Sequence, residues 1–133
     1  MKPYLLDTNI CIFYLRGLYN VSEKVEAIGR RNCCISEITV GELLYGAACS
    51  NHKDKHLKQI DLFINLIAIK PIYPILPTFA EEKARLRKKG LLIDDFDLLI
   101  GATALKHDMI LVTENVKHLS HIGNLQIENW IER

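Results

Sequence analysis

An acidic residue directly after a short apolar run constrains this chain more than any other feature. Asp7-Thr8-Asn9 follows Pro3-Tyr4-Leu5-Leu6, a run that is short and apolar enough to form a buried strand. A carboxylate at the end of a strand lies at the carboxyl edge of a sheet, where open α/β proteins bind their ligands. We therefore expect an α/β fold whose chemistry takes place at the edge that Asp7 occupies.

The size and composition of the chain indicate one ordinary domain over residues 1–133. Of its 133 residues, 49% are hydrophobic and 25% are charged, a composition that can bury a core. The longest apolar stretches, such as Leu66–Ile69, are far shorter than the roughly 18 residues of a membrane helix. Asp7 also interrupts what would be the apolar part of a signal peptide. We expect a cytoplasmic protein without a membrane segment.

The cysteines and the net charge argue against several kinds of site. Cys11, Cys33, Cys34 and Cys49 contain no Cys-x-x-Cys pair, which is the spacing of zinc knuckles and redox motifs, so we expect free and mostly buried thiols. The net charge of +1 does not indicate a nucleic-acid-binding protein. It is compatible with a polarised surface in which acids line a pocket and bases surround it. The scattered glycines form no phosphate-binding loop.

Short aliphatic runs alternate with helical patterns along the chain. Strands are expected at residues 3–6, 33–36, 72–75, 109–113 and 125–128. Helices are expected at residues 9–16, 22–31, 39–48, 54–69, 78–89 and 94–107, with Ser22, Thr78 and either Asp94 or Asp95 as N-caps. This alternation predicts a largely parallel sheet of about five strands, covered by helices on both faces and joined by right-handed crossovers.

Four polar residues far apart in the sequence are expected at the carboxyl edge of this sheet. Asp7 and Asn115 follow strands, whereas Glu42 and Asp97 lie in first helical turns, which start at the same edge. Carboxylates about 4 Å apart repel by roughly 4 kcal/mol at an effective dielectric constant of about 20, so three together favour a bound cation or a proton. Because oxygen ligands suit Mg²⁺ or Mn²⁺, the pattern predicts a metal site.

Each of these residues also has a purely structural explanation. Thr39-x-x-Glu42 has the pattern of a capping box, and the helix dipole favours an acid such as Glu42 or Asp97 in a first turn. Asp7 can form an Asx turn, and Asn115 can cap a short helix. The metal-site prediction therefore depends on all four residues meeting at one edge.

Two other clusters have simpler explanations. His52 and His56 are one helical turn apart, but the glutamate of the zinc-protease motif is missing between them, and an exposed helix face explains them. The basic cluster at residues 85–89 lies near the predicted end of a helix, where cations suit the dipole. These cations are also candidates for contacts to phosphates.

Four sequence blocks resemble the PIN-domain ribonucleases, and in particular the VapC toxins of prokaryotic toxin–antitoxin pairs. The blocks are Leu5-Leu6-Asp7-Thr8-Asn9-x-x-Ile12, Ser36-x-Ile38-Thr39-Val40-x-Glu42-Leu43-x-x-Gly46, Asp97-x-Leu99-Ile100-Gly101-Ala102-x-Ala104 and Val112-Thr113-x-Asn115. Glu128-Asn129-Trp130 resembles the family's usual ending. The resemblance covers nearly the whole chain and implies a three-layer α/β/α fold of the PIN type.

The resemblance implies a role for each residue at the predicted edge. The family's invariant metal-holding acids are matched by Asp7, Glu42 and Asp97. Asn115 matches a fourth catalytic position, which many relatives fill with Asp, and its amide would contribute a neutral oxygen. Residues that would support the site around these ligands are Thr8, Asn9, Asp94 and Thr113.

The function that the resemblance implies is endonucleolytic cleavage of RNA. With Mg²⁺ or Mn²⁺ held by the carboxylates, water would attack a phosphodiester and leave a 5′-phosphate and a 3′-hydroxyl. Such an enzyme would be the toxin of a type II pair and would inhibit translation, with a structured RNA such as tRNA as its substrate. The resemblance also implies a homodimer and a VapB-type antitoxin as partners.

Two other functions compete with the nuclease. A receiver-like or aspartyl phosphoryl-transfer domain also places an Asp after a strand, but the second acid expected near Asp7 is missing. A catalytically silent PIN-like module that binds RNA or protein is compatible with the fold, although degenerate members usually lose acids and this chain has all three. The sequence does not identify the RNA, the number of metal ions or the antitoxin.

Overall fold

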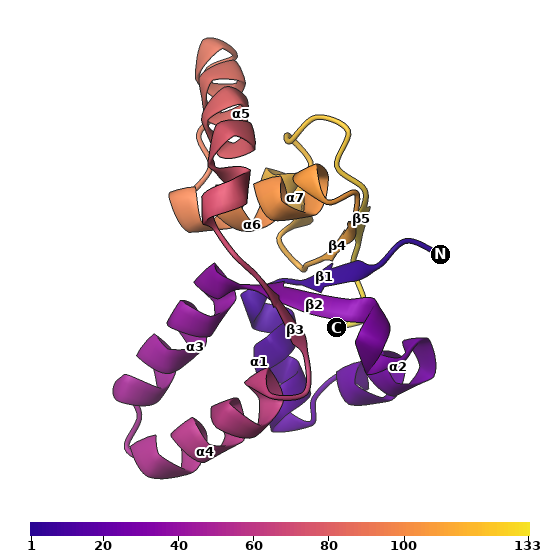
Figure 1. Cartoon of the computed structure of the whole chain (residues 1–133), viewed down its shortest axis with the longest axis vertical. Helices are drawn as coiled ribbons and strands as arrows, with labels where there is room; N and C mark the ends of the chain where they lie inside the picture. Colours follow the sequence, from indigo (N-terminus) through magenta and orange to yellow (C-terminus); the bar gives the residue numbers. More distant parts are fainter.

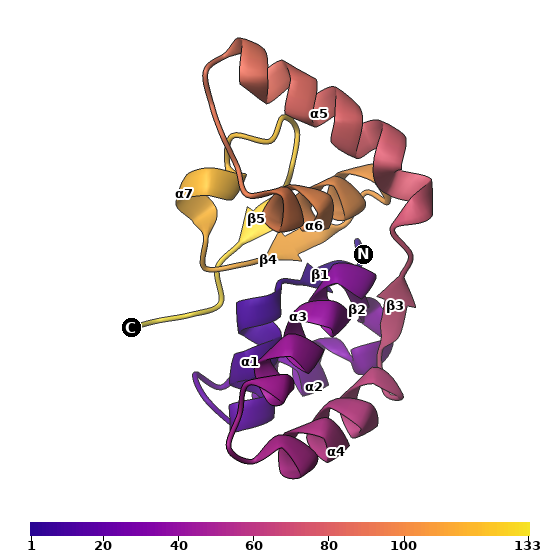
Figure 2. The same ribbon diagram turned by 90° about the vertical axis from the view of Figure 1, so that its left-hand side faces the viewer.

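The computed structural model describes all 133 residues and places a parallel five-stranded sheet between two layers of helices (Figures 1 and 2). The strands are β1 (Tyr4–Leu6), β2 (Cys33–Ser36), β3 (Ala68–Lys70), β4 (Ile110–Val112) and β5 (Ile127–Glu128). Their order across the sheet is β3-β2-β1-β4-β5, and every neighbouring pair is parallel. The predicted three-layer α/β/α fold is confirmed.

The helices divide by position in the chain. One face of the sheet is covered by α1 (Thr8–Arg16), α2 (Val21–Ile28), α3 (Glu37–Ala48) and α4 (Lys53–Ile64). The other is covered by α5 (Leu76–Lys88), α6 (Asp95–Lys106) and α7 (Val116–Leu119). Two short 3-10 helices, η1 (Arg30–Asn32) and η2 (Tyr73–Ile75), lie in the connections. None of the helices has the length and apolarity needed to cross a membrane.

Each face of the sheet has its own hydrophobic core. Successive strand residues point to opposite faces, so Leu6 and Val112 pack among α1 to α4, whereas Leu5 and Leu111 pack among α5 to α7. All four side chains are completely buried. The central strands therefore need apolar residues at every position, which explains their continuous aliphatic runs.

The chain passes from strand to helix at the carboxyl edge with almost no loop. Asp7 ends β1 and caps α1 by accepting the backbone N–H of Thr8 at 2.8 Å. Ser36 ends β2 and caps α3 by accepting the N–H of Ile38 at 3.0 Å. Both helices therefore start directly at this edge, and their first turns face each other.

The third strand and the helix before it differ from the prediction. The strand predicted at residues 72–75 is wrong: β3 lies at Ala68–Lys70, and residues 73–75 form η2. The helix predicted to reach Ile69 ends at Ile64, because the apolar residues that follow pair with β2 instead of continuing the helical stripe. The N–H of Ile72 donates to Glu37 Oε1 at 2.8 Å, which turns the chain away from the sheet.

Three predicted helix caps are also wrong. Helix α2 begins at Val21, so Ser22 is inside it. Helix α5 begins at Leu76 with a proline in its first turn, so Thr78 is also inside its helix. Proline is favoured there because its missing N–H would be unpaired in any case. Helix α3 begins at Glu37, so Thr39 is not an N-cap. Asp94, in contrast, caps α6 as predicted.

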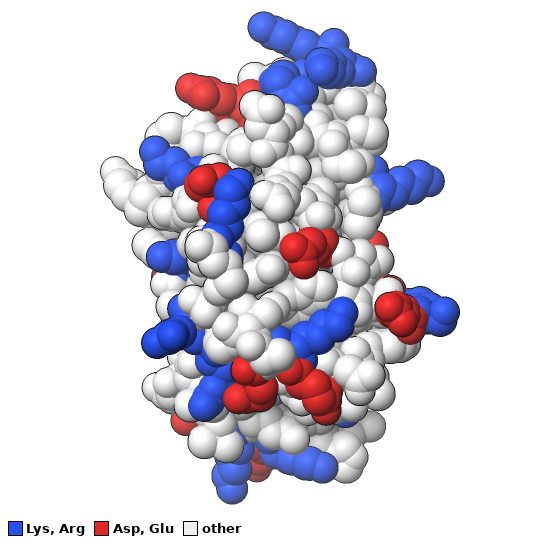
Figure 3. Space-filling model, turned by 90° about the vertical axis from the view of Figure 1, so that its right-hand side faces the viewer, with Lys and Arg blue, Asp and Glu red and all other residues white.

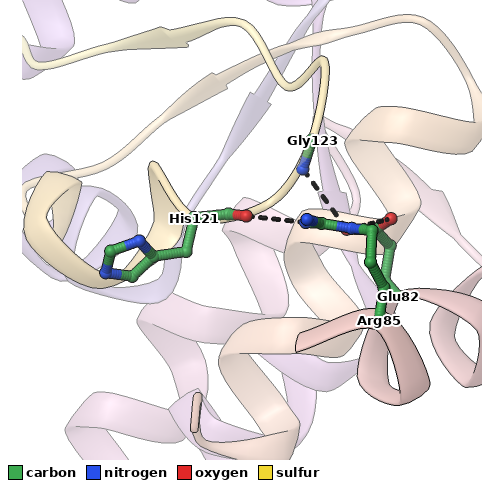
Figure 4. A network of polar contacts seen from close by, with 4 residues as sticks. All are labelled: Glu82, Arg85, His121 and Gly123. Atoms are coloured by element: carbon green, nitrogen blue, oxygen red, sulfur yellow. Dashed lines mark hydrogen bonds and ion pairs between the residues drawn. The ribbon is translucent and has the colours of Figure 1, made fainter. Parts of the chain in front are cut away.

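Arg85 of α5 holds the segment that follows α7 (Figure 4). Its guanidinium donates to Glu82 Oε2 at 2.8 Å and to the backbone carbonyl of His121 at 2.7 Å. The N–H of Gly123 donates to the same Glu82 oxygen at 3.3 Å. The hydrogen bond from Arg85 holds the pKa of Glu82 below its ordinary value. Arg85 is thus committed to the fold, unlike its basic neighbours.

We expect Arg85→Ala to lower the free energy of unfolding by about 1 to 3 kcal/mol, because a charged hydrogen-bonding group is lost. Urea denaturation monitored by circular dichroism measures the change. Arg87→Ala, which removes an exposed cation two residues away, is the matched control and should alter stability by less than about 0.5 kcal/mol. Equal losses in both variants would contradict the bracing role of Arg85.

Candidate functional site

Asp7 lies at the centre of the carboxyl edge and is only 6% exposed. Its Oδ1 accepts the N–H of Thr8 at 2.8 Å, and its Oδ2 accepts the hydroxyl of Thr113 at 2.7 Å. Burial raises the pKa of Asp7 above its ordinary value, and the two hydrogen bonds oppose that shift. The result is a buried carboxylate whose orientation is fixed by two neighbouring segments.

Glu42 is positioned by a chain of hydroxyl groups. Thr8 Oγ1 donates to Glu42 Oε1 at 2.6 Å and lies 3.1 Å from Thr39 Oγ1. Because Thr8 uses its only hydroxyl hydrogen in the bond to Glu42, Thr39 is the donor in its bond with Thr8. Thr39 is completely buried. The residue predicted to start a capping box therefore acts across the interface between α1 and α3.

Asp97 lies in the first turn of α6. Asp94 caps this helix by accepting the backbone N–H of Asp97 at 3.3 Å. Desolvation raises the pKa of Asp97 to about 6, and the negative charges of Asp7, Asp94 and Glu42 act in the same direction. Burial first, and the neighbouring negative charges second, therefore disfavour the charged form of Asp97.

Asn115 follows β4 and bridges Asp97 to a histidine. Its Nδ2 donates to Asp97 Oδ2 at 3.3 Å, and its Oδ1 lies 2.9 Å from His118 Nδ1. Since the carboxylate of Asp97 accepts, the amide turns its N–H toward Asp97 and its oxygen toward His118, whose Nδ1 then carries the hydrogen. The backbone N–H of Asn115 donates to Thr113 Oγ1 at 2.9 Å. One hydroxyl thus connects Asn115 with Asp7.

These side chains line one polar pocket with a volume of about 390 Å³. Its lining, which includes no hydrophobic residue, is Asp7, Thr8, Asn9, Glu42, Asp97, Glu114 and Asn115. All four residues predicted at the edge meet here, as do Thr8 and Asn9. Thr113 and Asp94 lie outside the lining and hold Asp7 and the start of α6.

Three residues near the site were not predicted as part of it. Glu114 lines the pocket and accepts from Arg133 Nε at 2.6 Å. His118 and Thr39 bond to residues of the pocket without lining it. The sequence could have indicated Thr39, because it lies one helical turn before Glu42, but that spacing is equally typical of a capping box. No sequence pattern indicated His118, because only the short helix α7 places it beside Asn115.

The donor set suits a hard divalent cation in type and in charge, because carboxylate oxygens predominate. No three His, Cys, Asp or Glu side chains converge closely enough to enclose an ion. Mutual repulsion favours such a spread, and Glu42 is drawn toward Thr8. The arrangement fits Mg²⁺, which keeps several waters and binds through one or two carboxylates.

Comparisons with known proteins find relatives over almost the whole chain. The model of the PIN domain family matches residues 4–125. The chain is 35% identical to Ribonuclease VapC2 of Rickettsia felis, over 96% of this chain and 97% of that protein. It is 31% identical to the tRNA(fMet)-specific endonuclease VapC of Shigella flexneri, over 98% and 99%. Among solved structures, DNA-bound VapBC from Salmonella typhimurium is similar with a TM-score of 0.90 and 29% identity, over 98% and 99% of the two chains.

We expect Asp97→Asn to be more stable than the parent at pH 8 but not at pH 4. The pKa of Asp97 rises from 3.8 to about 6 on folding, so the folded state favours the protonated form. Below pH 3.8 the carboxyl group is protonated in both the folded and the unfolded state, and it does not affect stability. Above about pH 6 it is charged in both states, and the full cost of burying the charge destabilises the folded state. The destabilisation therefore develops as the pH rises from 3.8 to about 6.

Urea denaturation in a chelating buffer at both pH values measures this difference. Asp61→Asn, which changes an exposed acid on α4, is the matched control and should show no such pH dependence. Equal stabilities of the parent and Asp97→Asn at pH 8 would show that burial and charge repulsion together cost the charged form of Asp97 little.

Proposed function

The chain belongs to the PIN-domain family, and on this premise we propose that it is a metal-dependent endoribonuclease, the toxin of a type II toxin–antitoxin pair. The observation that carries this proposal is the meeting of Asp7, Glu42 and Asp97 in one polar pocket. The relatives named ribonucleases support it. We take residues 1–133 as a single PIN domain that works in the cytosol, where its four free cysteines would stay reduced.

The proposed cofactor is Mg²⁺, with Mn²⁺ as an alternative, and the residues proposed to hold it, directly or through the waters it keeps, are Asp7, Asp97 and Glu42. When bound, the ion supplies a lowered pKa for the attacking water and neutralises charge on the phosphodiester. The protein orients these ligands before the metal arrives. Thr113 fixes the carboxylate of Asp7, and the pair of Thr39 and Thr8 fixes that of Glu42.

Asn115 has a separate role in the proposed site. Its N–H donates to Asp97 Oδ2, which stabilises the charged form of a carboxyl group with a raised pKa. His118 keeps the amide in this orientation by bonding its oxygen. A neutral residue in the fourth position adds no further negative charge to the pocket, so the RNA phosphate meets less repulsion.

The proposed protein partner is a VapB-type antitoxin. A second hollow of about 370 Å³ lies among α1, α3 and α4, and its lining includes the apolar residues Ile12, Leu15 and Leu43. Glu42 lines both this hollow and the polar pocket, so a peptide bound in the hollow would end beside the carboxylates. Solved relatives described as VapBC complexes support the assignment.

We further propose that the protein forms a homodimer and cleaves a structured RNA such as tRNA. Three exposed apolar side chains, Leu66, Ile69 and Tyr73, lie close together in the sequence in and around the edge strand β3, and exposed apolar groups are typical of interfaces when they form a patch. Two relatives are named tRNA(fMet)-specific endonucleases. Cleavage of such an RNA would inhibit translation.

We expect Asp7→Asn to slow RNA cleavage at least about a thousandfold, equivalent to roughly 4 kcal/mol of barrier. The cleavage of total tRNA by purified protein, with Mg²⁺ and with chelator, measures the rate, and the 5′-phosphate ends are mapped. Asp61→Asn is the control and should cleave like the parent. An active Asp7→Asn protein would refute the site, and a folded but inactive parent would favour a silent binding module.

We expect Thr39→Val to slow cleavage about tenfold, the equivalent of one hydrogen bond of about 1.4 kcal/mol. Thr8 would lose the hydrogen bond from Thr39 that orients its hydroxyl toward Glu42. Valine keeps the shape of the side chain without its hydroxyl. Thr39→Ser keeps the hydroxyl and should retain the parental rate. If valine and serine have the same effect, packing at position 39 and not its hydrogen bond matters.

A further inference from the structure

Building on the proposed function, we propose that one face of α5 binds the phosphate backbone of the RNA substrate. We call it the α5 cationic face. It is a shallow hollow on the helix surface, lined by Phe79, Ala80, Lys83, Ala84, Arg87 and Lys88. The face includes Arg87 and Lys88 of the basic cluster at residues 85–89. Arg85 of the same cluster is instead bonded to Glu82 and His121.

The spacing of these residues shapes the hollow. Phe79, Lys83 and Arg87 are four residues apart, so they form one row along α5. Ala80 and Ala84 lie in the adjacent row, and their side chains end at Cβ. The short alanine side chains therefore leave a depression beside the long side chains of Lys83 and Arg87, with room for a polymer backbone to approach.

The unpaired positive charge of the basic cluster lies at this end of α5. Arg85 is bonded to Glu82 and His121 (Figure 4). Arg87, Lys88 and Lys89 are exposed, and none of the chain's five ion pairs includes them. Figure 3 shows basic side chains projecting from the end of the molecule where α5 ends in Figure 1. A chain of net charge +1 thus has a local excess of cations.

Helix-dipole stabilisation accounts for only part of this arrangement. It favours cations in the last turn, where Arg87 and Lys88 lie, but its effect fades within one turn. Lys83 is in the middle of α5, and its Nζ lies 5.7 Å from the centroid of the Phe79 ring. Lys83, Arg87 and Lys88 together place three cations around one hollow of α5, an arrangement that suits a ligand with repeated negative charge.

Lys83 joins the α5 cationic face to α6, the helix that carries Asp97 of the polar pocket. Lys83 Nζ pairs with Asp95 Oδ1 at 2.8 Å, and Asp95 is two residues before Asp97 in the first turn of α6. The pocket itself carries several carboxylates and repels phosphates, so a substrate needs cations beside it. The α5 cationic face, which contacts α6 through Lys83, supplies such cations.

The chemistry of the face favours RNA over a protein. Its floor is mostly apolar, formed by the Phe79 ring, two alanine methyl groups and the alkyl stems of the cations, but it is far smaller than the hydrophobic centre of a stable protein interface. Arg87 and Lys88, which have no acidic partner, suit phosphates instead, whose binding releases counterions. The occupant we infer is therefore the RNA backbone.

The test compares two double variants in the cleavage-deficient Asp7→Asn protein, with total tRNA as the probe. Arg87→Gln/Lys88→Gln removes two charges from the α5 cationic face. Lys55→Gln/Lys58→Gln, the matched control, removes two exposed charges from α4, which lies at the other end of the molecule (Figure 1). Binding is measured by fluorescence anisotropy over a range of salt concentrations, with circular dichroism to check the fold.

We expect the first variant to bind at least about tenfold more weakly at low salt, with the slope of log K against log salt reduced by about 1.4 to 1.8, or 0.7 to 0.9 for each phosphate contact. The control should keep the parental slope. Equal slopes in the two double variants would overturn the proposal. An oligomeric state altered only in the first variant, measured by sedimentation, would also overturn it and assign the face to a second copy of the chain.

Cleavage assays separate this proposal from the proposed function. If the protein with Asp7 restored does not cleave tRNA, the nuclease assignment fails, while the salt slopes still test the face. If it cleaves and Arg87→Gln/Lys88→Gln raises KM about tenfold with little change in kcat, both hold. If it cleaves and KM is unchanged, only the α5 cationic face is refuted.

Discussion

The hydrogen bond from Thr113 to Asp7 joins the two halves of the chain at the point on which the site depends. The two residues are 106 positions apart, and their side-chain oxygens lie 2.7 Å apart. The bond follows directly from the pairing of β1 with β4, in which the N–H of Asp7 donates to the carbonyl of Val112 at 2.9 Å. Because both strands are completely buried near this edge, the backbone that carries the carboxylate cannot move without disturbing the cores of both layers.

This rigidity holds together charges that repel. Asp7 and Asp97 both have raised pKa values, mainly because burial disfavours their charged forms. Hydroxyl and amide donors offset part of that cost, through Thr113 at Asp7, Thr8 at Glu42 and Asn115 at Asp97. The fold thus accepts locally unfavourable electrostatics at its functional edge, as is common where a site is organised in advance for its ligand.

The sequence was sufficient for the features that depend on pattern. Aliphatic runs followed by polar residues located β1, β2 and β4, and the four edge residues met as expected. It was insufficient where two structures share one pattern. The apolar residues after Ile64 fit a helical stripe as well as a strand, and only pairing with β2 decides between them. Thr39 likewise fits both a cap and a contact to Thr8. Arg85 and Arg87 look alike in sequence, and tertiary contacts alone distinguish them.

The central claim is that the carboxylates at the end of β1 and in α6 form a site for a divalent cation. A crystal structure of the protein soaked with Mn²⁺, with anomalous diffraction data, tests it most directly. We predict an anomalous peak within coordination distance of both Asp7 and Asp97, and no peak there for Asp7→Asn under the same conditions. A parent crystal with Mn²⁺ bound elsewhere, or with none in the polar pocket, would contradict the claim.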